Sequence, residues 1–318
     1  PPRCCSLHTV AMSARDPSAT EGAHANDTSS EPGPQDHAAM LSRLHQLTGE
    51  EFGQHQTNYR LSMASASLAL QQSAFFDALT DLHKELRDTF QAESIRSIEA
   101  WANGETELRI SVKSWESAID KLYRLNVEEN RTQGEPPCVP TIFELARDGE
   151  LQREYRDQAH QGTDWITPQK IHLFADDLVR TKFVVPFVDG VINVSNRIEQ
   201  LAELHGHPHY KRYHAKDSGY HARHIYIVMD TVLPGQSESK ITLEVKILTK
   251  LQDTLGELTH LLYELKRTGQ VETKKKRKLA WEIESEDFSA SYLGHSAHYL
   301  ESEIVNLKHK LEKLNRKS

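Results

Sequence analysis

Hydrophobic positions in the first third of the chain follow a helical period. Between Leu41 and Trp101, apolar side chains recur at spacings of three, four or seven residues, which is typical of amphipathic helices. The positions that carry this period are Leu61, Leu68, Phe75, Leu79, Leu82, Leu86 and Phe90. We therefore expect one or two amphipathic helices, which end where Asn103 and Gly104 interrupt the pattern.

The centre of the chain alternates between strand-like and helix-like patterns. Concentrated β-branched and aromatic residues predict strands at 108–112, 181–187, 223–232 and 240–248. Apolar residues at helical spacing predict helices at 114–124, 142–155, 191–205 and 251–265. This order implies an α/β (α+β) fold, in which helices flank a mixed β-sheet.

The end of the chain carries a heptad pattern. Its apolar residues are spaced four, three, four and three apart, at Leu300, Ile304, Leu307, Leu311 and Leu314, with Glu and Lys beside them. Two readings stay open at this point. The segment is either an amphipathic helix that packs on its own domain, or one that pairs with a partner helix.

These patterns predict four regions. Residues 1–37 are polar and lack periodicity, so we expect a disordered tail. A helical N-terminal region follows at 38–104, and the α/β domain occupies 105–270, with a Gly- and Pro-containing insertion at about 128–165. A basic linker and the C-terminal amphipathic helix form 271–318.

Composition excludes several classes of protein. The 318 residues carry a net charge of −8, so any anion site must be local. Three cysteines, two of them adjacent, indicate neither a disulfide framework nor a zinc finger. No apolar run approaches the roughly twenty residues that span a membrane. We therefore expect a protein of the reducing cytoplasm, not a membrane protein.

The first candidate segment joins a strand to a helix. Lys113 stands at the strand end and Lys121 two turns along the helix, for which Ser114 is a candidate cap and Ser117 the third helical residue. Ammonium groups and backbone amides at such a junction can hold a polyphosphate. The alternative is that both lysines are merely solvated.

Two carboxylates precede a predicted strand. Asp176 and Asp177 come just before the apolar run of Phe183 and its neighbours. A carboxylate at the head of a buried strand can bind Mg²⁺. The alternative is a helix or turn cap, which is the usual role of an isolated aspartate.

A polar turn supplies the third segment. Gly219 permits a tight turn, and Tyr220 offers a ring on which a base can stack. Lys216, Arg223 and His224 are candidate contacts to phosphate or ribose. The alternative is a plain hairpin loop with a half-buried tyrosine.

The fourth segment places a glutamate inside an apolar strand. Side chains alternate between faces, so Glu244, Lys246 and Leu248 point one way, while Val245 and Ile247 point the other. A carboxylate in such surroundings requires a metal or a base as partner.

Together, the four segments resemble the RelA/SpoT family of guanosine tetra- and pentaphosphate synthetases. The resemblance covers about Ser111 to Tyr263, and the chain resembles a small, stand-alone synthetase. The segments that carry it are SVKSWESAIDKLYR, GYHARH, EVKILT and LGELTHLLY.

The resemblance implies a nucleotidyltransferase-like mixed sheet and transfer of the β,γ-pyrophosphate of ATP to a ribose 3′-oxygen. It implies that Asp177 and Glu244 are the catalytic and Mg²⁺-binding residues, with Glu244 activating the acceptor hydroxyl. The residues expected on the ATP side are Lys113, Ser117, Lys121 and Arg109. Those expected on the acceptor side are Lys216, Tyr220, Arg223 and His224.

The chain also departs from the family pattern. Ser111 stands where the family usually has an arginine that packs on adenine, and Arg109 is the expected substitute. Arg180 and Lys182 replace a glycine and an arginine, while Lys246 and Leu248 replace a glutamine and an arginine. Leucine offers no bidentate donor, so altered specificity is a serious alternative.

Three functions remain open on these grounds. The first is synthesis of guanosine tetra- or pentaphosphate from GDP or GTP. The second is a toxin-type transfer to the 3′-end of tRNA, compatible with the basic run at 274–278. The third is a catalytically silent nucleotide-binding protein that forms homo-oligomers through residues 300–314.

Overall fold

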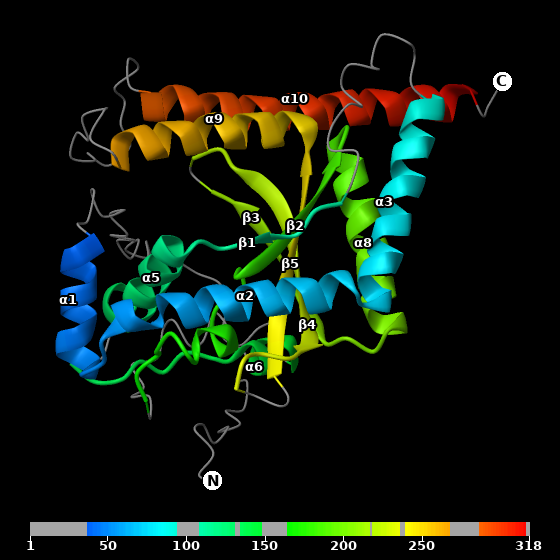
Figure 1. Ribbon diagram of the computed structural model, residues 1–318. Helices are drawn as coiled ribbons and strands as arrows, with labels where there is room; N and C mark the ends of the chain where they lie inside the picture. Colours follow the sequence, from blue (N-terminus) through cyan, green and yellow to red (C-terminus); the bar gives the residue numbers. More distant parts are fainter. Residues whose placement is uncertain are drawn as a thin grey trace, which may run out of the picture.

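The computed structural model describes residues 37–93, 108–130, 134–147, 164–216, 218–235, 239–267 and 286–315. Its strands are β1 (Ser111–Val112), β2 (Val179–Val185), β3 (His209–Ala215), β4 (His221–Thr231) and β5 (Ser239–Thr249). Its principal helices are α1 (His37–Thr48), α2 (Gln56–Gln71), α3 (Ala74–Glu93), α5 (Trp115–Tyr123), α6 (Ile142–Arg147), α8 (Val188–Leu204), α9 (Lys250–Arg267) and α10 (Glu286–Asn315). The expected mixed sheet flanked by helices is confirmed (Figure 1).

The five strands form one sheet in the order β1-β2-β5-β4-β3. Only β2 and β5 run parallel, and the other neighbours are antiparallel. The central strand β5 is therefore covered on both edges and buried along nearly its whole length. Residues placed on β5 meet neighbours from β2 on one side and from β4 on the other.

The two faces of the sheet differ in chemistry. The alternation expected for β5 is confirmed, because Leu243, Val245 and Ile247 join the main core. Helices α2 and α8 contribute apolar residues to that same core. The opposite face carries polar and aromatic side chains, so charged groups gather there.

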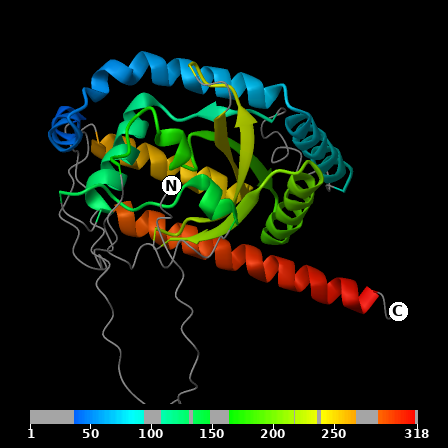
Figure 2. The ribbon, with the colours of Figure 1, turned by 90° about the horizontal axis from the view of Figure 1, so that it is seen from below.

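The N-terminal helices correct one expectation. Three helices occupy the stretch where one or two were predicted, and they wrap around the edge of the molecule (Figure 2). Leu61 and Leu68 are exposed on α2, whereas Tyr59 and Met63 are buried. A 3₁₀ helix (Phe52–His55) precedes α2, and α2 ends at Gln71. Each interruption changes the direction in which the following helical positions face, so a single hydrophobic period does not describe the whole stretch.

Strand β3 was not expected from the sequence. Its side chains are mostly charged or aromatic, with no apolar alternation, and only Tyr210 is buried. As an edge strand it needs no apolar run, because one side faces no neighbouring strand. The predicted strand at 108–112 shortens to Ser111–Val112.

The C-terminal helix α10 lies alongside α9 over one end of the sheet (Figure 1). It packs on its own domain through Gly294, Ala297, Glu301 and Val305, which are all buried. No helix among the described residues is long and apolar enough to cross a membrane. Most of the predicted tail and the whole basic run at 274–278 lie outside the described residues.

A buried asparagine fixes the segment that leads into β2. Asn126 donates to the carbonyl oxygens of Leu122 and Ile166, at 3.0 and 2.8 Å. Its Oδ1 accepts from the amide of Ile166 at 3.1 Å. Because both backbone groups of Ile166 are satisfied by one side chain, the chain is held about ten residues before the carboxylates at the head of β2.

Replacing this side chain should therefore destabilise the fold. We expect Asn126→Ala to lower the free energy of unfolding by about 2–3 kcal/mol, since it leaves buried backbone groups unpaired. Urea denaturation measures this change. The exposed Asn306→Ala serves as control and should lie within about 0.5 kcal/mol of the unsubstituted protein. Equal losses in the two variants would contradict the role of Asn126.

Candidate active site on the polar face of the sheet

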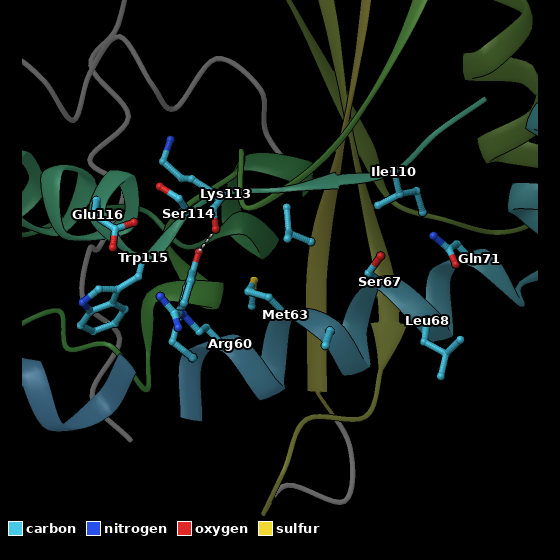
Figure 3. Close-up of a pocket in the computed structure, with 13 residues that line it drawn as sticks. Arg60, Met63, Ser67, Leu68, Gln71, Ile110, Lys113, Ser114, Trp115 and Glu116 are labelled. Atoms are coloured by element: carbon cyan, nitrogen blue, oxygen red, sulfur yellow. Dashed lines mark hydrogen bonds between the residues drawn. The ribbon is translucent and has the colours of Figure 1, made fainter. Parts of the chain in front are cut away.

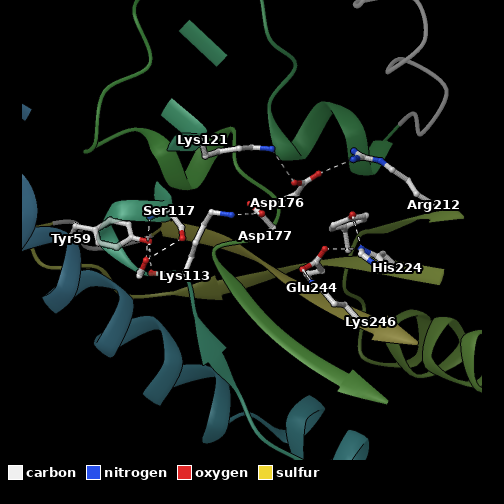
Figure 4. A network of polar contacts seen from close by, with 12 residues as sticks. Tyr59, Lys113, Ser117, Lys121, Asp176, Asp177, Arg212, His224, Glu244 and Lys246 are labelled. Atoms are coloured by element: carbon white, nitrogen blue, oxygen red, sulfur yellow. Dashed lines mark hydrogen bonds and ion pairs between the residues drawn. The ribbon is translucent and has the colours of Figure 1, made fainter. Parts of the chain in front are cut away.

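Neighbouring strands bring two distant carboxylates to one region. Asp177 precedes β2 by two residues, and Glu244 stands on β5 opposite Arg180. Strand alternation turns Glu244 away from the apolar core, as expected. The two carboxylates are close enough that the charge of Asp177 works to raise the pKa of Glu244. The structure therefore unites residues that lie far apart in the sequence (Figure 4).

Asp177 is paired with a buried lysine. The Nζ atom of Lys113 lies 2.6 Å from Oδ2 of Asp177. Burial works to raise the pKa of Asp177, but the charges of Lys121 and Lys113 outweigh burial and hold that pKa well below its usual range. Burial in turn lowers the pKa of Lys113, with partial compensation from Asp177. Asp177 is thus ionised at neutral pH.

The neighbouring Asp176 forms a second ionic cluster. Arg212 lies 3.0 Å and Lys121 3.9 Å from its carboxylate oxygens, and Tyr210 donates to Oδ2 at 3.2 Å. The Arg212 guanidinium also lies over the rings of Tyr210 and Tyr226, at 5.1 and 4.8 Å from their centroids. Asp176 therefore holds two cations beside the pair formed by Asp177.

Glu244 belongs to a hydrogen-bonded chain that ends at the predicted stacking tyrosine. Nδ1 of His224 lies 2.8 Å from Oε1 of Glu244, and Nε2 lies 3.0 Å from the hydroxyl of Tyr220. Burial raises the pKa of Tyr220, so its hydroxyl stays protonated and can donate to Nε2. A neutral His224 then carries its proton on Nδ1 and donates it to Glu244.

The charge state of Glu244 follows from these contacts. Burial works to raise its pKa, but the hydrogen bond from His224 and the charge of Lys246 outweigh burial and lower it. Tyr226 adds a hydroxyl 3.2 Å from Nδ1 of His224. The second oxygen of Glu244 lies 3.7 Å from Nζ of Lys246. Glu244 is thus an oriented, ionised carboxylate.

Two carboxylate oxygens at this site are buried without a hydrogen-bond partner among the described residues. They are Oδ1 of Asp177 and Oε2 of Glu244. Buried carboxylate oxygens left in this way suit a divalent cation that prefers oxygen ligands. No described cluster offers three or more His, Cys, Asp or Glu side chains to a metal. A cation here would use these two carboxylates and take its other ligands from substrate or water.

Cations outnumber carboxylates around the site. Five basic side chains and three acidic ones gather there: Lys113, Lys121, Arg180, Arg212 and Lys246, with Asp176, Asp177 and Glu244. Among the described residues, Nε and Nη2 of Arg212 and Nε of Arg180 are buried without a hydrogen-bond partner. A polyanion would supply the missing acceptors.

The structure places other predicted residues differently. Arg223 lies on the opposite face of β4 from His224 and points toward α8, where its Nη1 lies 3.5 Å from the hydroxyl of Ser195. Arg109 is exposed in the chain before β1. The amide of Ser117 donates to the hydroxyl of Ser114, which confirms the predicted cap of α5. The ammonium group of Lys216 lies 5.7 Å from the centre of the Tyr220 ring.

Four charged residues of the site were given no role in the expected set: Asp176, Arg180, Arg212 and Lys246. Asp176 was seen beside Asp177, but nothing in the sequence gave it a partner. The alternation of β2 indicates the face of Arg180, once its pairing with Glu244 is known. Arg212 could not be found, because β3 itself was not expected.

A separate groove of about 520 Å³ lies between α2 and the edge strand β1 (Figure 3). Apolar side chains such as Met63, Leu68 and Trp115 line much of it. Its lining includes Lys113, but that side chain extends away from α2 toward Asp177. The groove therefore does not coincide with the carboxylates.

Comparisons with known proteins find only distant similarity, to solved structures. No family model matches this sequence, and no curated protein matches it. Small alarmone synthetase 1 from Bacillus subtilis is 14% identical over 83% of this chain and 98% of its own, with a TM-score of 0.43. A GTP pyrophosphokinase family protein from Streptococcus pneumoniae is 18% identical over 76% and 97%, with a TM-score of 0.37. At these values, the activities of those proteins do not carry over to this chain.

The lowered pKa of Asp177 predicts a specific acid sensitivity. Below its unfolded pKa, the unfolded chain binds a proton that the folded state does not, so the stability that Asp177 contributes is lost as pH falls. We expect this loss to reach about 1 kcal/mol between about pH 5 and about pH 3. Urea denaturation at several pH values should show a shallower decline for Asp177→Asn.

The exposed Asp230 provides the control for this measurement. It forms an ion pair with Lys240 at the surface, where solvent screens the interaction. We therefore expect Asp230→Asn to keep the pH dependence of the unsubstituted protein. An identical decline in the Asp177→Asn variant would show that Asp177 is not held ionised in the folded state.

Proposed function

We propose that this protein is a Mg²⁺- and ATP-dependent pyrophosphotransferase that acts on the ribose 3′-hydroxyl of GDP or GTP. The observation that carries the proposal is the pair of buried carboxylate oxygens on Asp177 and Glu244 that accept no hydrogen bond among the described residues, surrounded by an excess of cations. The resemblance of the four sequence segments to RelA/SpoT synthetases supports the same reaction. Both the geometric observation and the sequence resemblance concern residues of this chain, and neither depends on the solved structures.

Asp177 and Glu244 are the residues that would hold Mg²⁺. Mg²⁺ usually takes one or two protein carboxylates and completes its shell with phosphate oxygens and water, which suits the two carboxylate oxygens that accept no hydrogen bond among the described residues. When bound, the ion neutralises charge that develops on the transferring phosphates.

The cations next to Asp176 and Asp177 form the ATP side of the site. Lys113 and Lys121 approach from the β1–α5 junction, and Arg212 approaches from β3. Because Arg212 keeps two unpaired nitrogens, it can bind phosphate oxygens without leaving Asp176. We assign Arg212 and Arg180 the phosphate contacts that the missing family arginines would otherwise supply.

Glu244, His224 and Tyr220 form the acceptor side. In the proposed step, the 3′-oxygen attacks the β-phosphorus of ATP, the bond to the α-phosphate breaks, and AMP leaves. The proton of the 3′-hydroxyl passes to Glu244, which is ionised and oriented by His224. Tyr220 offers its ring to the guanine base, with Lys216 beside it.

A label-transfer assay tests the reaction and identifies the acceptor. The protein is mixed with Mg²⁺, ATP labelled at the γ-phosphate and GDP, GTP or deacylated tRNA. Label on GDP or GTP is the expected result. Label on tRNA alone would assign the toxin-type reaction instead, and transfer to none of them by the folded protein would favour a silent nucleotide-binding protein.

Removal of one charge from Glu244 tests its role. We expect Glu244→Gln to reduce transfer by about 10²- to 10⁴-fold, because an amide cannot accept the proton. Circular dichroism should show an unchanged fold. Glu203→Gln, at an exposed position of α8, is the matched control and should keep full activity. Equal activity in both variants would sink this assignment.

We also propose that the outer face of α10 pairs with α10 of a second copy. Leu300, Ile304, Leu307, Leu311 and Leu314 are 42–65% exposed, while the inner face is held against the domain. The two readings of the heptad pattern are thus compatible. An exposed row of apolar residues at heptad spacing can be buried by pairing with a partner helix.

Charge favours an antiparallel pair. If Ile304 of one copy packs against Leu307 of the other, Glu303 of each copy faces Lys310 of its partner. Antiparallel helices also set opposite ends of their dipoles side by side. The ionic contacts and the dipoles therefore favour the same orientation.

Charge reversal tests this arrangement. We expect the protein to be a dimer or larger by light scattering coupled to size exclusion, and Glu303→Lys to weaken the assembly by placing like charges opposite each other. Combining it with Lys310→Glu should restore the assembly. A monomer at all concentrations, or no rescue in the double variant, would exclude the antiparallel pair.

A further inference from the structure

Helix α10 touches the turn between β3 and β4 through two glycines. Gly219 has a φ of +80°, in the region that favours glycine. A Cβ atom on Gly294 would lie 2.5 Å from the carbonyl oxygen of Gly219, and one on Gly219 would lie 2.5 Å from the carbonyl oxygen of Ser291. The two backbones are therefore so close that neither position has room for a side chain.

Side chains around this contact tie three elements together. Gln252 of α9 is buried, donates to the carbonyl oxygen of Gly294 at 2.9 Å and accepts from the amide of His221 at 3.3 Å. The ring of His221 stacks on His298 of α10 with centroids 4.0 Å apart. The start of β4 is thus fixed to α9 and α10 by several independent contacts.

The fixed turn carries the acceptor-side residues. Tyr220 directly follows Gly219, and its hydroxyl reaches His224, which in turn contacts Glu244. The amide of Lys216 donates to the carbonyl oxygen of Tyr220 at 3.0 Å. The position of the Tyr220 ring relative to Glu244 therefore depends on where α10 holds Gly219.

We propose that Gly294 of α10 is a positioning residue for the acceptor, because its contact with Gly219 sets the place of Tyr220 and Lys216 beside Glu244. This inference rests on the proposed pyrophosphotransferase function. It assigns the C-terminal helix a part in acceptor binding, although α10 contributes no side chain to the carboxylate and phosphate-binding cluster. The residues of the ATP side, Lys113 and Lys121, lie on the β1–α5 segment and pair with Asp177 and Asp176.

Gly294→Ala is the direct test. Alanine is the better helix former, so any loss comes from the contact with Gly219. We expect the KM for the acceptor that the unsubstituted protein uses to rise about tenfold to a hundredfold, since small misplacements of binding groups have effects of this size. The KM for ATP should stay within about twofold.

Gly256→Ala provides the matched control. Gly256 lies in the neighbouring helix α9, and a Cβ atom there would meet nothing within 4 Å. This variant should leave both KM values unchanged. An unchanged acceptor KM in Gly294→Ala, or equal rises in both KM values, would overturn the positioning role.

Hydrogen exchange gives a readout that does not depend on activity. Amides of residues 218–224 should exchange faster in Gly294→Ala than in Gly256→Ala, and His298→Ala, which removes the stacked ring without adding volume, should shift them in the same direction. Unchanged exchange in both α10 variants would refute the contact as the support of the turn. If the unsubstituted protein transfers label to no acceptor, the proposed function fails; if it does transfer and Gly294→Ala behaves like it, only this inference fails.

Discussion

A carboxylate in the middle of a central strand is the constraint on which the site depends. Glu244 is 4% exposed and lies on the central strand between β2 and β4, so its carboxylate is almost entirely removed from bulk water. Burying a charge of this kind is costly unless hydrogen bonds and opposite charges compensate it. His224 and Lys246 supply that compensation for one oxygen and part of the other. Oε2 accepts no hydrogen bond among the described residues, which is why we propose that a bound cation contacts it.

The same reasoning extends across the polar face. Asp177 and Asp176 each hold a cation from the β1–α5 junction, and Arg212 adds a third from the far edge of the sheet. These ion pairs are largely buried, so desolvation of the charges offsets much of their attraction, whereas removing one partner of a pair is costly. The excess of positive charge is then a property of the assembled sheet, whereas the whole chain is acidic. The proposed polyphosphate site depends on this local excess of positive charge.

The C-terminal helix α10 contacts the turn before β4 through backbone atoms, and this turn leads to Tyr220. The described residues of the turn before β4 include no aliphatic side chain, and the glycine contact with α10 ties this turn to the rest of the fold. One helix thereby serves two surfaces. Its inner face sets the turn that carries Tyr220, and its outer face presents a leucine-rich seam.

The sequence by itself determined the elements whose pattern is periodic and whose burial is strong. Strand β5, with apolar residues at every second position, could be placed with its polar face known, and Ser114 could be recognised as a cap because capping is a local interaction. Glu244, Tyr220 and His224 were singled out in this way, as residues at ends or faces of such elements, whereas the choice of Asp177 over Asp176 rested on the resemblance to RelA/SpoT synthetases.

Only the tertiary structure decided which of these residues meet. Strand β3 has no apolar run, so the position of Arg212 could not be predicted. Arg223 was expected on the acceptor side with His224, but it lies on the opposite face of β4, near Ser195. The buried face of α2 depended on where its helical phase restarts. The contact of Gly219 with Gly294 joins segments 75 residues apart through backbone atoms alone. Sequence periodicity reports local geometry and burial, whereas pairing between distant segments is set by packing, which leaves no periodic trace.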